Sequence, residues 1–288
     1  MRTAAAYPLR SPARIAGRVL AHGILVLLGL VWLVPSLGLF VTSWRSPSDI
    51  AASGWWNALV EWRYTLANYG EVLSARGFAN NFLNSLIITV PSTLFPIAVG
   101  ALAGYALAWM RFRGRDFIYL GVMALLVVPL QLTWVPVLRL FNTFGLTGTF
   151  AGIWLVHTAF GLPFAVFLLR NFIAELPGAF IESARVDGAS ELMIFSRIVL
   201  PLSLPALASL AIFQFVWVWN DLMNALIFLQ IRDKYPLTAA IQSLLGQFGS
   251  EWHLLAAGSF VAMSVPLLVF FALQRYFVRG ITVGGVKG

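Results

Sequence analysis

Four side chains that can form hydrogen bonds lie three or four residues apart in an otherwise apolar stretch. They are Gln214, Trp217, Asp221 and Asn224. This spacing places all four on one face of a continuous helix. Such a stripe can hydrogen-bond a polar ligand and stack on its apolar faces. The same groups can instead join neighbouring membrane helices by hydrogen bonds, and both interpretations stay open.

Asp221 is the only acidic or basic side chain well inside a predicted membrane span. Such a residue costs roughly 2.5 to 3.5 kcal/mol at a helix centre, so it is expected to face a cavity or a polar partner. Asn220 precedes it in the same candidate path. Gln131 and His157 are predicted at a similar depth and can line one cavity with Asp221, although each taken singly fits a packing role better.

The composition indicates a protein whose solvent is lipid. Of 288 residues, 60% are hydrophobic and 10% are charged, which leaves too little polar surface for a soluble domain. The net charge of +8 lies at the flanks of apolar runs, so nucleic acid is not an expected partner. The absence of cysteine excludes disulfides and thiolate chemistry, and three scattered histidines give no metal-ligand spacing, so no metal site is expected.

Hydropathy predicts an all-α polytopic membrane protein with six spans. Each run is long enough to cross the hydrocarbon core and must be helical, because lipid cannot satisfy an open backbone. Prolines inside the runs are expected to kink them. The predicted spans are Val19–Val41, Phe82–Trp109, Phe117–Leu138, Thr149–Leu169, Leu204–Leu229 and Leu254–Phe277.

The first apolar run is too long for the core of a signal peptide and lacks a small-residue cleavage site, so we expect a membrane helix. With a cytoplasmic N-terminus, thirteen Lys and Arg residues fall inside and six outside. The positive-inside rule then predicts that both termini are cytoplasmic. The expected parts are a cytoplasmic segment 1–18, a six-helix domain 19–277 with a long cytoplasmic loop 170–203, and a cytoplasmic tail 278–288.

The 170–203 loop is predicted to form two short helices meeting at an elbow. Pro177 suits a first helical turn, and Asp187-Gly188 is a turn signal. The first helix is expected to place Phe180, Ala184, Val186 and Ile181 toward one side and Glu182 and Arg185 on another. A helix this short is marginal alone. It needs either a partner protein or the lipid headgroups to pack against.

The loop resembles the EAA loop of permeases from binding-protein-dependent ABC importers. Glu182-Ser183-Ala184, Gly188, Ile198 and Leu200-Pro201 stand at the family spacing, with Ser183 in place of the middle alanine. Trp219-Asn220-Asp221-Leu222 and the C-terminal residues 278–288 resemble carbohydrate-uptake permeases of the MalG type. The resemblance implies a MetI/MalG-like permease fold.

The resemblance also implies roles for particular residues. Glu182, Ser183, Ala184, Asp187, Gly188 and Pro201 correspond to the coupling helix and elbow that dock on an ATPase subunit, and Gly284, Gly285, Lys287 and Gly288 to a tail that contacts the ATPase subunits. The chain has no phosphate-binding loop of its own, so ATP and Mg would be bound by the partner subunits and this chain would be no enzyme.

The implied assembly contains a second permease subunit, two ATPase subunits and an extracytoplasmic sugar-binding protein in a bacterial or archaeal cytoplasmic membrane. The implied substrate is an oligosaccharide or α-glucoside such as maltose or trehalose, with glycerol-3-phosphate as an alternative solute. An ion-coupled transporter would need further charged residues inside the spans. A membrane enzyme would need a nucleophile and base or clustered metal ligands, and neither is visible.

Overall fold

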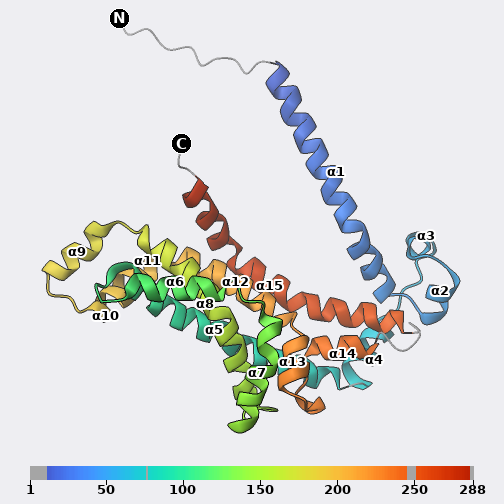
Figure 1. The fold of residues 1–288 in the computed structure, drawn as a ribbon. Helices are drawn as coiled ribbons and strands as arrows, with labels where there is room; N and C mark the ends of the chain where they lie inside the picture. Colours follow the sequence, from blue (N-terminus) through green and yellow to red (C-terminus); the bar gives the residue numbers. More distant parts are fainter. Residues whose placement is uncertain (1–11, 76, 245–250, 286–288) are drawn as a thin grey trace, which may run out of the picture.

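The computed structural model describes residues 12–75, 77–244 and 251–285, and every regular element in this part of the chain is a helix. Four helices are long and apolar enough to cross a membrane without interruption. They are α1 (Pro12–Ser43), α5 (Phe78–Trp109), α8 (Phe150–Ala174) and α15 (Trp252–Gly285). Figure 1 shows α5, α8 and α15 in one bundle, with α1 diverging from it.

The predicted third span is not one helix, which corrects the expectation for Phe117–Leu138. It consists of α6 (Arg115–Leu125) and α7 (Leu130–Thr143), bent by 102°. Pro129 lacks an N–H group and disfavours helical geometry at Val128, so the helix ends just before it. The N–H groups of Leu126 to Val128 donate to carbonyl groups three residues back. These bonds give the backbone N–H groups of the turn hydrogen-bond partners.

The predicted fifth span is also broken. Helix α12 (Leu204–Trp219) stops, and the short helix α13 (Met223–Phe228) follows after three residues. The broken backbone is stabilised by Thr238, whose Oγ1 donates to the carbonyl of Asp221 over 2.9 Å. The prediction of one continuous helix from Leu204 to Leu229 is therefore wrong, since side-chain hydrogen bonds make an interruption tolerable at this depth.

Before α12, a run of short elements continues the 170–203 loop. It comprises α9 (Gly178–Val186), α10 (Glu191–Ile194), the π-helical turn η2 (Phe195–Val199) and α11 (Leu200–Leu202). The axis turns by 74° between Leu202 and Leu204. This pair and α6–α7 bring the possible spans from four to six if each bent pair counts as one.

The core of the bundle is the contact between α5 and α8, which depends on two glycines. A Cβ atom at Gly100 would lie 2.8 Å from the Cβ of Ala165, and one at Gly104 would lie 2.9 Å from the backbone nitrogen of Arg170. These glycines are four residues apart, the small-residue spacing that lets membrane helices approach closely. No larger side chain fits at either position without moving the neighbouring backbone.

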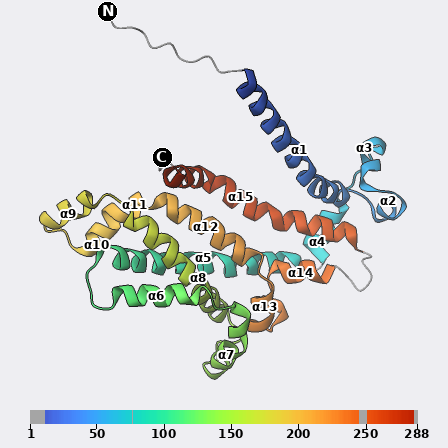
Figure 2. The ribbon, with the colours of Figure 1, turned by 45° about the horizontal axis from the view of Figure 1, so that its top comes forward.

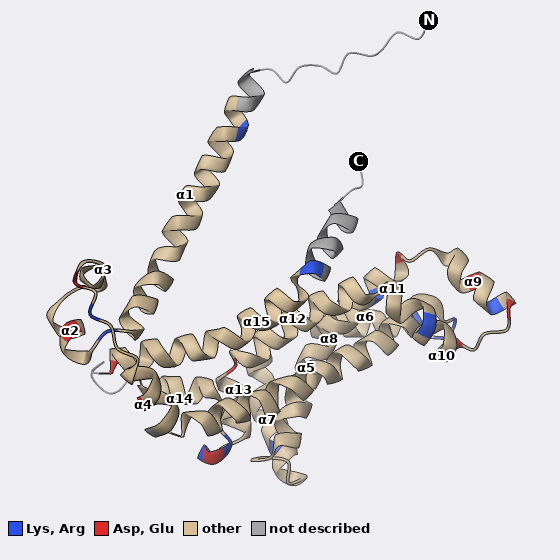
Figure 3. Ribbon diagram, turned by 180° about the vertical axis from the view of Figure 1, so that it is seen from behind, with Lys and Arg blue, Asp and Glu red and all other residues tan. Residues whose placement is uncertain are grey.

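Short helices cover the end of the bundle opposite α9 and α10. They are α2 (Pro47–Ala52), η1 (Trp55–Asn57), α3 (Ala58–Glu61), α4 (Ala67–Ala75), η3 (Arg232–Lys234) and α14 (Leu237–Leu244). Asn84 donates to the carbonyl groups of Asp233 and Tyr235 over 2.7 and 3.1 Å. Figure 3 shows the charged residues concentrated toward the ends of the long helices.

Helix α1 is the least covered of the long helices. Only 6% of its most apolar window is buried, against 39% for α5 and 44% for α8. Its contacts are near its C-terminal end, where the Phe40 ring lies 5.1 Å from the Phe260 ring of α15. Figures 1 and 2 both show the rest of α1 extending away from the bundle. This apolar surface suits lipid or another membrane subunit.

Candidate functional site: an elbow and a polar cluster

The elbow predicted in the 170–203 loop is present between α9 and α10. Gly188 has a φ of +81°, a left-handed conformation that glycine adopts without strain. The N–H of Ala189 bonds to the carbonyl of Ala184, and that of Gly188 to the carbonyl of Arg185, which together form a Schellman ending. Ser190 then caps α10 by accepting the N–H of Met193. Local sequence chemistry therefore fixes the turn.

Four residues, here called the elbow cluster, hold α9 against α10 and the end of α5: Tyr105, Trp109, Arg185 and Glu191. Arg185 donates from Nε and Nη2 to the two carboxylate oxygens of Glu191 over 2.9 and 3.2 Å. Its Nη2 also donates to the Trp109 carbonyl over 3.1 Å. The Tyr105 hydroxyl donates to Glu191 Oε2. A fork of this kind fixes geometry as well as adding energy.

The electrostatics of the elbow cluster favour its charged forms. Hydrogen bonding from Arg185 and then from Tyr105 lowers the pKa of Glu191 below its ordinary value. Hydrogen bonding to Glu191 raises the pKa of Arg185 above its own ordinary value. Both side chains remain partly exposed, at 35% for Arg185 and 41% for Glu191, so solvent screens their attraction.

The exposed face of α9 differs from the predicted one. Ile181 is the buried member at 1% exposure, whereas Phe180 and Val186 are exposed at 53% and 87%. The prediction that these three share one side is therefore wrong, because the inner face of α9 packs on Trp109 and α10 instead. Large apolar side chains that stay exposed on a short helix at one end of the bundle are typical of a contact surface.

Most of the predicted coupling residues line one groove. It has a volume of about 410 Å³ and lies between α9 and the η2–α11 turn. It is lined by Phe180, Ser183, Ala184, Asp187, Arg197, Ile198, Pro201 and Leu202. Glu182 and Gly188 are exposed and lie outside this lining. The spacing of the EAA stretch thus brings residues 18 positions apart, Ser183 and Pro201, to the same groove.

The predicted polar stripe is divided by the break after Trp219. Gln214 and Trp217 lie on α12, whereas Asp221 lies in the break and Asn224 on α13. Asp221 Oδ1 accepts from the backbone N–H of Asn224 over 3.4 Å and from its Nδ2 over 3.2 Å. Asp221 therefore caps the first turn of α13, a role that the assumption of one continuous helix could not give it.

The residues after the break form a polar cluster with α7 and α8. His157 Nε2 of α8 lies 3.6 Å from Asp221 Oδ2, and the edge of the His157 ring meets the Trp217 ring at a centroid separation of 5.4 Å. Trp134 Nε1 of α7 donates to Asn224 Oδ1 over 3.0 Å. The cluster thus brings side chains of α7, α8 and the break together. Its hydrogen bonds are incomplete, because His157 Nδ1 and Asp221 Oδ2 are buried without a hydrogen-bond partner in the described part of the chain.

The remaining members of the candidate path are more dispersed. Gln214 is buried and donates to the Ser92 carbonyl over 3.2 Å. It lines a cavity of about 300 Å³ together with Trp217 and Gly161. Asn220 is exposed and donates to the carbonyl of Val216. Gln131 is exposed on α7 and does not line this cavity, so a cavity shared with His157 and Asp221 stays a prediction.

Two remaining predictions concern the C-terminal tail and the absence of a metal site. Helix α15 continues through Gly284 and Gly285, so the first part of the predicted tail is helical. Lys287 and Gly288 lie outside the described residues. Within the ranges that the structure describes, no group of three or more His, Cys, Asp or Glu side chains is arranged to hold a metal ion.

Sequence reasoning missed two features of these sites. The elbow cluster escaped it because Tyr105 and Glu191 are 86 residues apart. The Arg185 and Glu191 pair, six residues apart across a turn signal, was the available hint. The close approach of α5 and α8 also escaped it, although the spacing of Gly100 and Gly104 is a readable signal.

The fold and the elbow define a multi-span membrane protein with a two-helix projection at one end, held by the elbow cluster. Residues 97–283 match the family described as "Binding-protein-dependent transport system inner membrane component". The chain belongs to this family of ABC importer permeases. In this family the permease is non-catalytic, and ATP hydrolysis belongs to separate subunits.

Two curated relatives cover most of this chain. It is 51% identical over 273 residues to the osmoprotective compounds uptake permease protein GgtD of Synechocystis, across 92% of this chain and 91% of that protein. It is 56% identical over 232 residues to the alpha-glucoside transport system permease protein AglG of Rhizobium meliloti, across 78% of this chain and 61% of that protein.

The solved structures include a permease of the same fold. A chain in the crystal structure of a bacterial ABC transporter involved in the import of the acidic polysaccharide alginate superimposes with a TM-score of 0.76. The match covers 94% of this chain and 100% of that chain at 22% identity. At this identity the likeness shows the fold alone.

Proposed function

We propose that this chain is one permease subunit of an ATP-driven importer for α-glucosides or related oligosaccharides. The observation that carries the proposal is the elbow, which presents an exposed apolar face and a groove at one end of the bundle. The substrate class is supported by relatives named for alpha-glucosides, arabinooligosaccharides and melibiose, raffinose and stachyose. A relative named for osmoprotective compounds adds such solutes to the candidates.

The proposed mechanism is mechanical coupling. ATP binding closes two partner ATPase subunits, and the docked α9–α10 projection carries that motion into the spans, shifting an equilibrium between inward-open and outward-open forms. Phe180 and Val186 are exposed and would enter the ATPase surface, with Ser183, Ala184, Asp187 and Pro201 along the groove. Gly188 sets the elbow angle, and Glu182 offers an exposed charge to the partner.

The proposed assembly contains a second permease subunit, two ATPase subunits and an external sugar-binding protein. The largely uncovered α1 supports a second membrane subunit, since 6% burial leaves its apolar surface to lipid or a partner helix. ATP and Mg would be bound by the ATPase subunits, which the C-terminal Gly284, Gly285, Lys287 and Gly288 are proposed to contact. The importer would lie in the cytoplasmic membrane of its cell.

The orientation is testable because the chain has no cysteine. Val186 and Val60 are both highly exposed, at 87% and 81%, and lie at opposite ends of the bundle. In intact spheroplasts, a membrane-impermeant maleimide should label a Val60→Cys variant. It should label Val186→Cys only after permeabilisation. Labelling of Val186→Cys from outside would overturn the coupling proposal.

The polar stripe is proposed to hold the break of the fifth span, with sugar contact limited to the cavity beside Trp217. Its hydrogen bonds favour this assignment, because Asp221 Oδ1 accepts from Asn224 and Asn224 Oδ1 accepts from Trp134 of α7. Uptake should keep its apparent sugar affinity in an Asp221→Asn variant and lose affinity in Trp217→Ala. Equal affinity in both variants would remove the stripe from the sugar path.

Transport itself is tested by reconstitution with the ATPase, the second permease and the binding protein in liposomes. Labelled maltose and trehalose should accumulate only with internal ATP, whereas glycerol-3-phosphate should not. Uptake driven by an ion gradient without ATP would favour a secondary transporter, an alternative that the family membership does not favour.

A further inference from the structure

The five-residue connection between α5 and α6 carries an unusual charge for its size. It contains Arg111 and Arg113, and Arg115 begins α6. Gly114 takes a φ of +83°, which allows the chain to turn sharply into α6. An open cleft of about 440 Å³ is lined by Arg111, Phe112, Gly114, Arg115, Asp116 and Phe117. Two guanidinium groups therefore line one small cleft, and Arg113 lies on the same connection.

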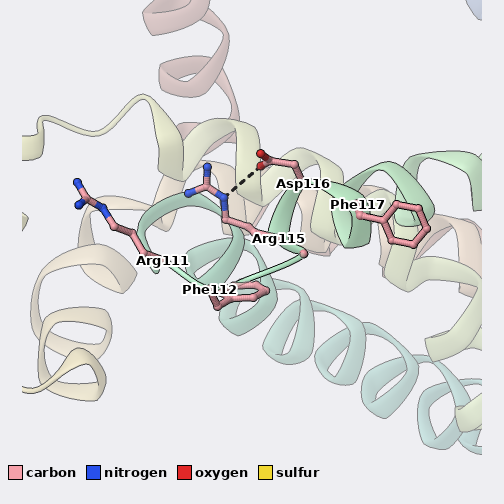
Figure 4. A pocket seen from close by; sticks show the side chains of 6 residues that line it. Arg111, Phe112, Arg115, Asp116 and Phe117 are labelled. Atoms are coloured by element: carbon pink, nitrogen blue, oxygen red, sulfur yellow. Dashed lines mark hydrogen bonds and ion pairs between the residues drawn. The ribbon is translucent and has the colours of Figure 1, made fainter.

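Two of these three guanidinium groups have no partner within the described part of the chain. Arg115 Nε donates to Asp116 Oδ1 over 3.2 Å, whereas neither hydrogen bonds nor ion pairs involve the side chains of Arg111 and Arg113 there. Figure 4 shows Arg111 and Arg115 reaching to the same side of the connection. The first N–H groups of α6 open at this end and add a favourable field for an anion.

Two apolar residues that line the cleft indicate that it faces the membrane surface. Phe112 and Phe117 are exposed at 42% and 81%, and Figure 4 shows Phe117 pointing along α6, away from the arginines. A short connection between two membrane helices cannot leave the headgroup layer. Exposed rings and guanidinium groups lining one cleft match the membrane surface, where acyl chains lie beneath a layer of phosphates.

We propose that residues 111–117 form a binding site for the headgroup phosphate of an anionic phospholipid. Arg111 binds the phosphodiester from the lining of the cleft, and Arg113 adds positive charge from the same connection. Arg115 shares its charge between the phosphate and Asp116. Phe112 and Phe117 pack among the acyl chains. A soluble acidic protein surface fits less well, because it would leave an 81% exposed phenyl ring beside it without an apolar partner.

The site has a structural link to the elbow cluster. The Trp109 carbonyl, which accepts from Arg185, lies two residues before Arg111. Trp109 Nε1 also donates to the carbonyl of Ile173 over 2.9 Å. A lipid held at this connection therefore contacts the end of α5 to which α9 is tied.

The test uses the complete transporter in nanodiscs that contain phosphatidylglycerol and phosphatidylcholine, with retained lipids counted by native mass spectrometry. Neutralising the site in Arg111→Gln/Arg113→Gln/Arg115→Gln should reduce the preference for phosphatidylglycerol about 30-fold, since two unpartnered arginines contribute about 1 kcal/mol each. The matched control is Arg63→Gln/Arg139→Gln/Arg232→Gln. It removes the same charge from exposed positions elsewhere and should keep the preference.

The variant Arg111→Lys/Arg113→Lys/Arg115→Lys retains the charge and should retain most of the preference for phosphatidylglycerol. Its retention would show that the loss in the Gln variant comes from lost charge and not from misfolding. Preference unchanged in the Gln variant, or lost equally in the control, overturns the proposal. Two further outcomes also overturn it. One is displacement of the lipid by millimolar inorganic phosphate, which indicates a site for soluble anions. The other is release of the ATPase with lipid retained, which indicates a protein contact.

Discussion

Removal of the Arg185 guanidinium should loosen the elbow without unfolding the bundle. The Arg185→Ala change deletes two bonds to Glu191, of 2.9 and 3.2 Å, and one of 3.1 Å to the Trp109 carbonyl. A pair this exposed contributes about 0.2 to 1 kcal/mol, toward the upper end for a bidentate fork. The screened bond to Trp109 adds about 0.5 to 1 kcal/mol.

The total loss is therefore about 1 to 2 kcal/mol, which lowers the ratio of locked to open elbow roughly 5- to 30-fold. The natural lack of cysteine permits nitroxide labels at Ala179→Cys and Leu192→Cys, one on each side of the elbow. Electron paramagnetic resonance should show a broader distance distribution in Arg185→Ala. In the reconstituted transporter, fewer sugar molecules should enter per ATP hydrolysed, because a loose lever transmits less motion.

The control is the exchange Arg185→Glu/Glu191→Arg. It restores an ion pair between the same two positions, but the new carboxylate cannot donate to the Trp109 carbonyl. We therefore expect partial recovery of both the narrow distance distribution and the coupling ratio. Unchanged distances in Arg185→Ala, or an exchange variant as impaired as the sum of its single changes, would refute a rigid elbow.

Three further predictions concern packing, pH and the break. Gly104→Ala should lower the free energy of unfolding by about 1 to 3 kcal/mol, because its Cβ would lie 2.9 Å from the backbone nitrogen of Arg170. The control is Gly121→Ala, where a Cβ would meet open space. In detergent the control should unfold at an unchanged or higher temperature. The pKa of Glu191 is lowered in the folded chain. Its contribution to the stability of the elbow is therefore fully present above the ordinary pKa near 4.5 and is lost as the pH falls through the lower folded-state pKa. Hydrogen exchange at the elbow should accelerate in acid, and a Glu191→Gln variant should show no such acceleration. Trp134→Phe removes one interhelical hydrogen bond to Asn224 and should cost about 0.6 kcal/mol of unfolding free energy, measured by chemical denaturation. The control Trp32→Phe changes a residue of α1 that is 81% exposed and should leave the unfolding free energy unchanged.

The sequence predicted the long helices well because apolar length is a local property. The second span, expected as Phe82–Trp109, is Phe78–Trp109 in the structure and ends at the same residue. The sixth, expected to end at Phe277, continues to Gly285, since hydropathy detects the lipid boundary and not the end of a helix. The elbow was also predictable, because one glycine in a turn signal determines it.

Hydropathy could not predict the two breaks, because it averages over a window and does not register backbone continuity. Pro129 was a readable signal for the first break. The second, at Asn220–Leu222, depends on Thr238 and Asn224 supplying hydrogen bonds from outside α12. Spacing arguments about the stripe assumed regular helix through this point. Such arguments hold for Gln214 and Trp217, and they fail for Asp221.

The broken span explains why an acidic residue is tolerated well inside a membrane span. A regular helix at Asp221 would leave its carboxylate without backbone donors, whereas the break places the N–H of Asn224 within 3.4 Å of it. Asp221 therefore stabilises the irregular backbone that accommodates it. The α12 ladder ends at Trp219, and the backbone that follows depends on side-chain hydrogen bonds from Asn224 and Thr238. Under the proposed coupling, the break is the point in the fifth span at which motion from the elbow would exchange these bonds and rearrange the backbone beside the Trp217 cavity.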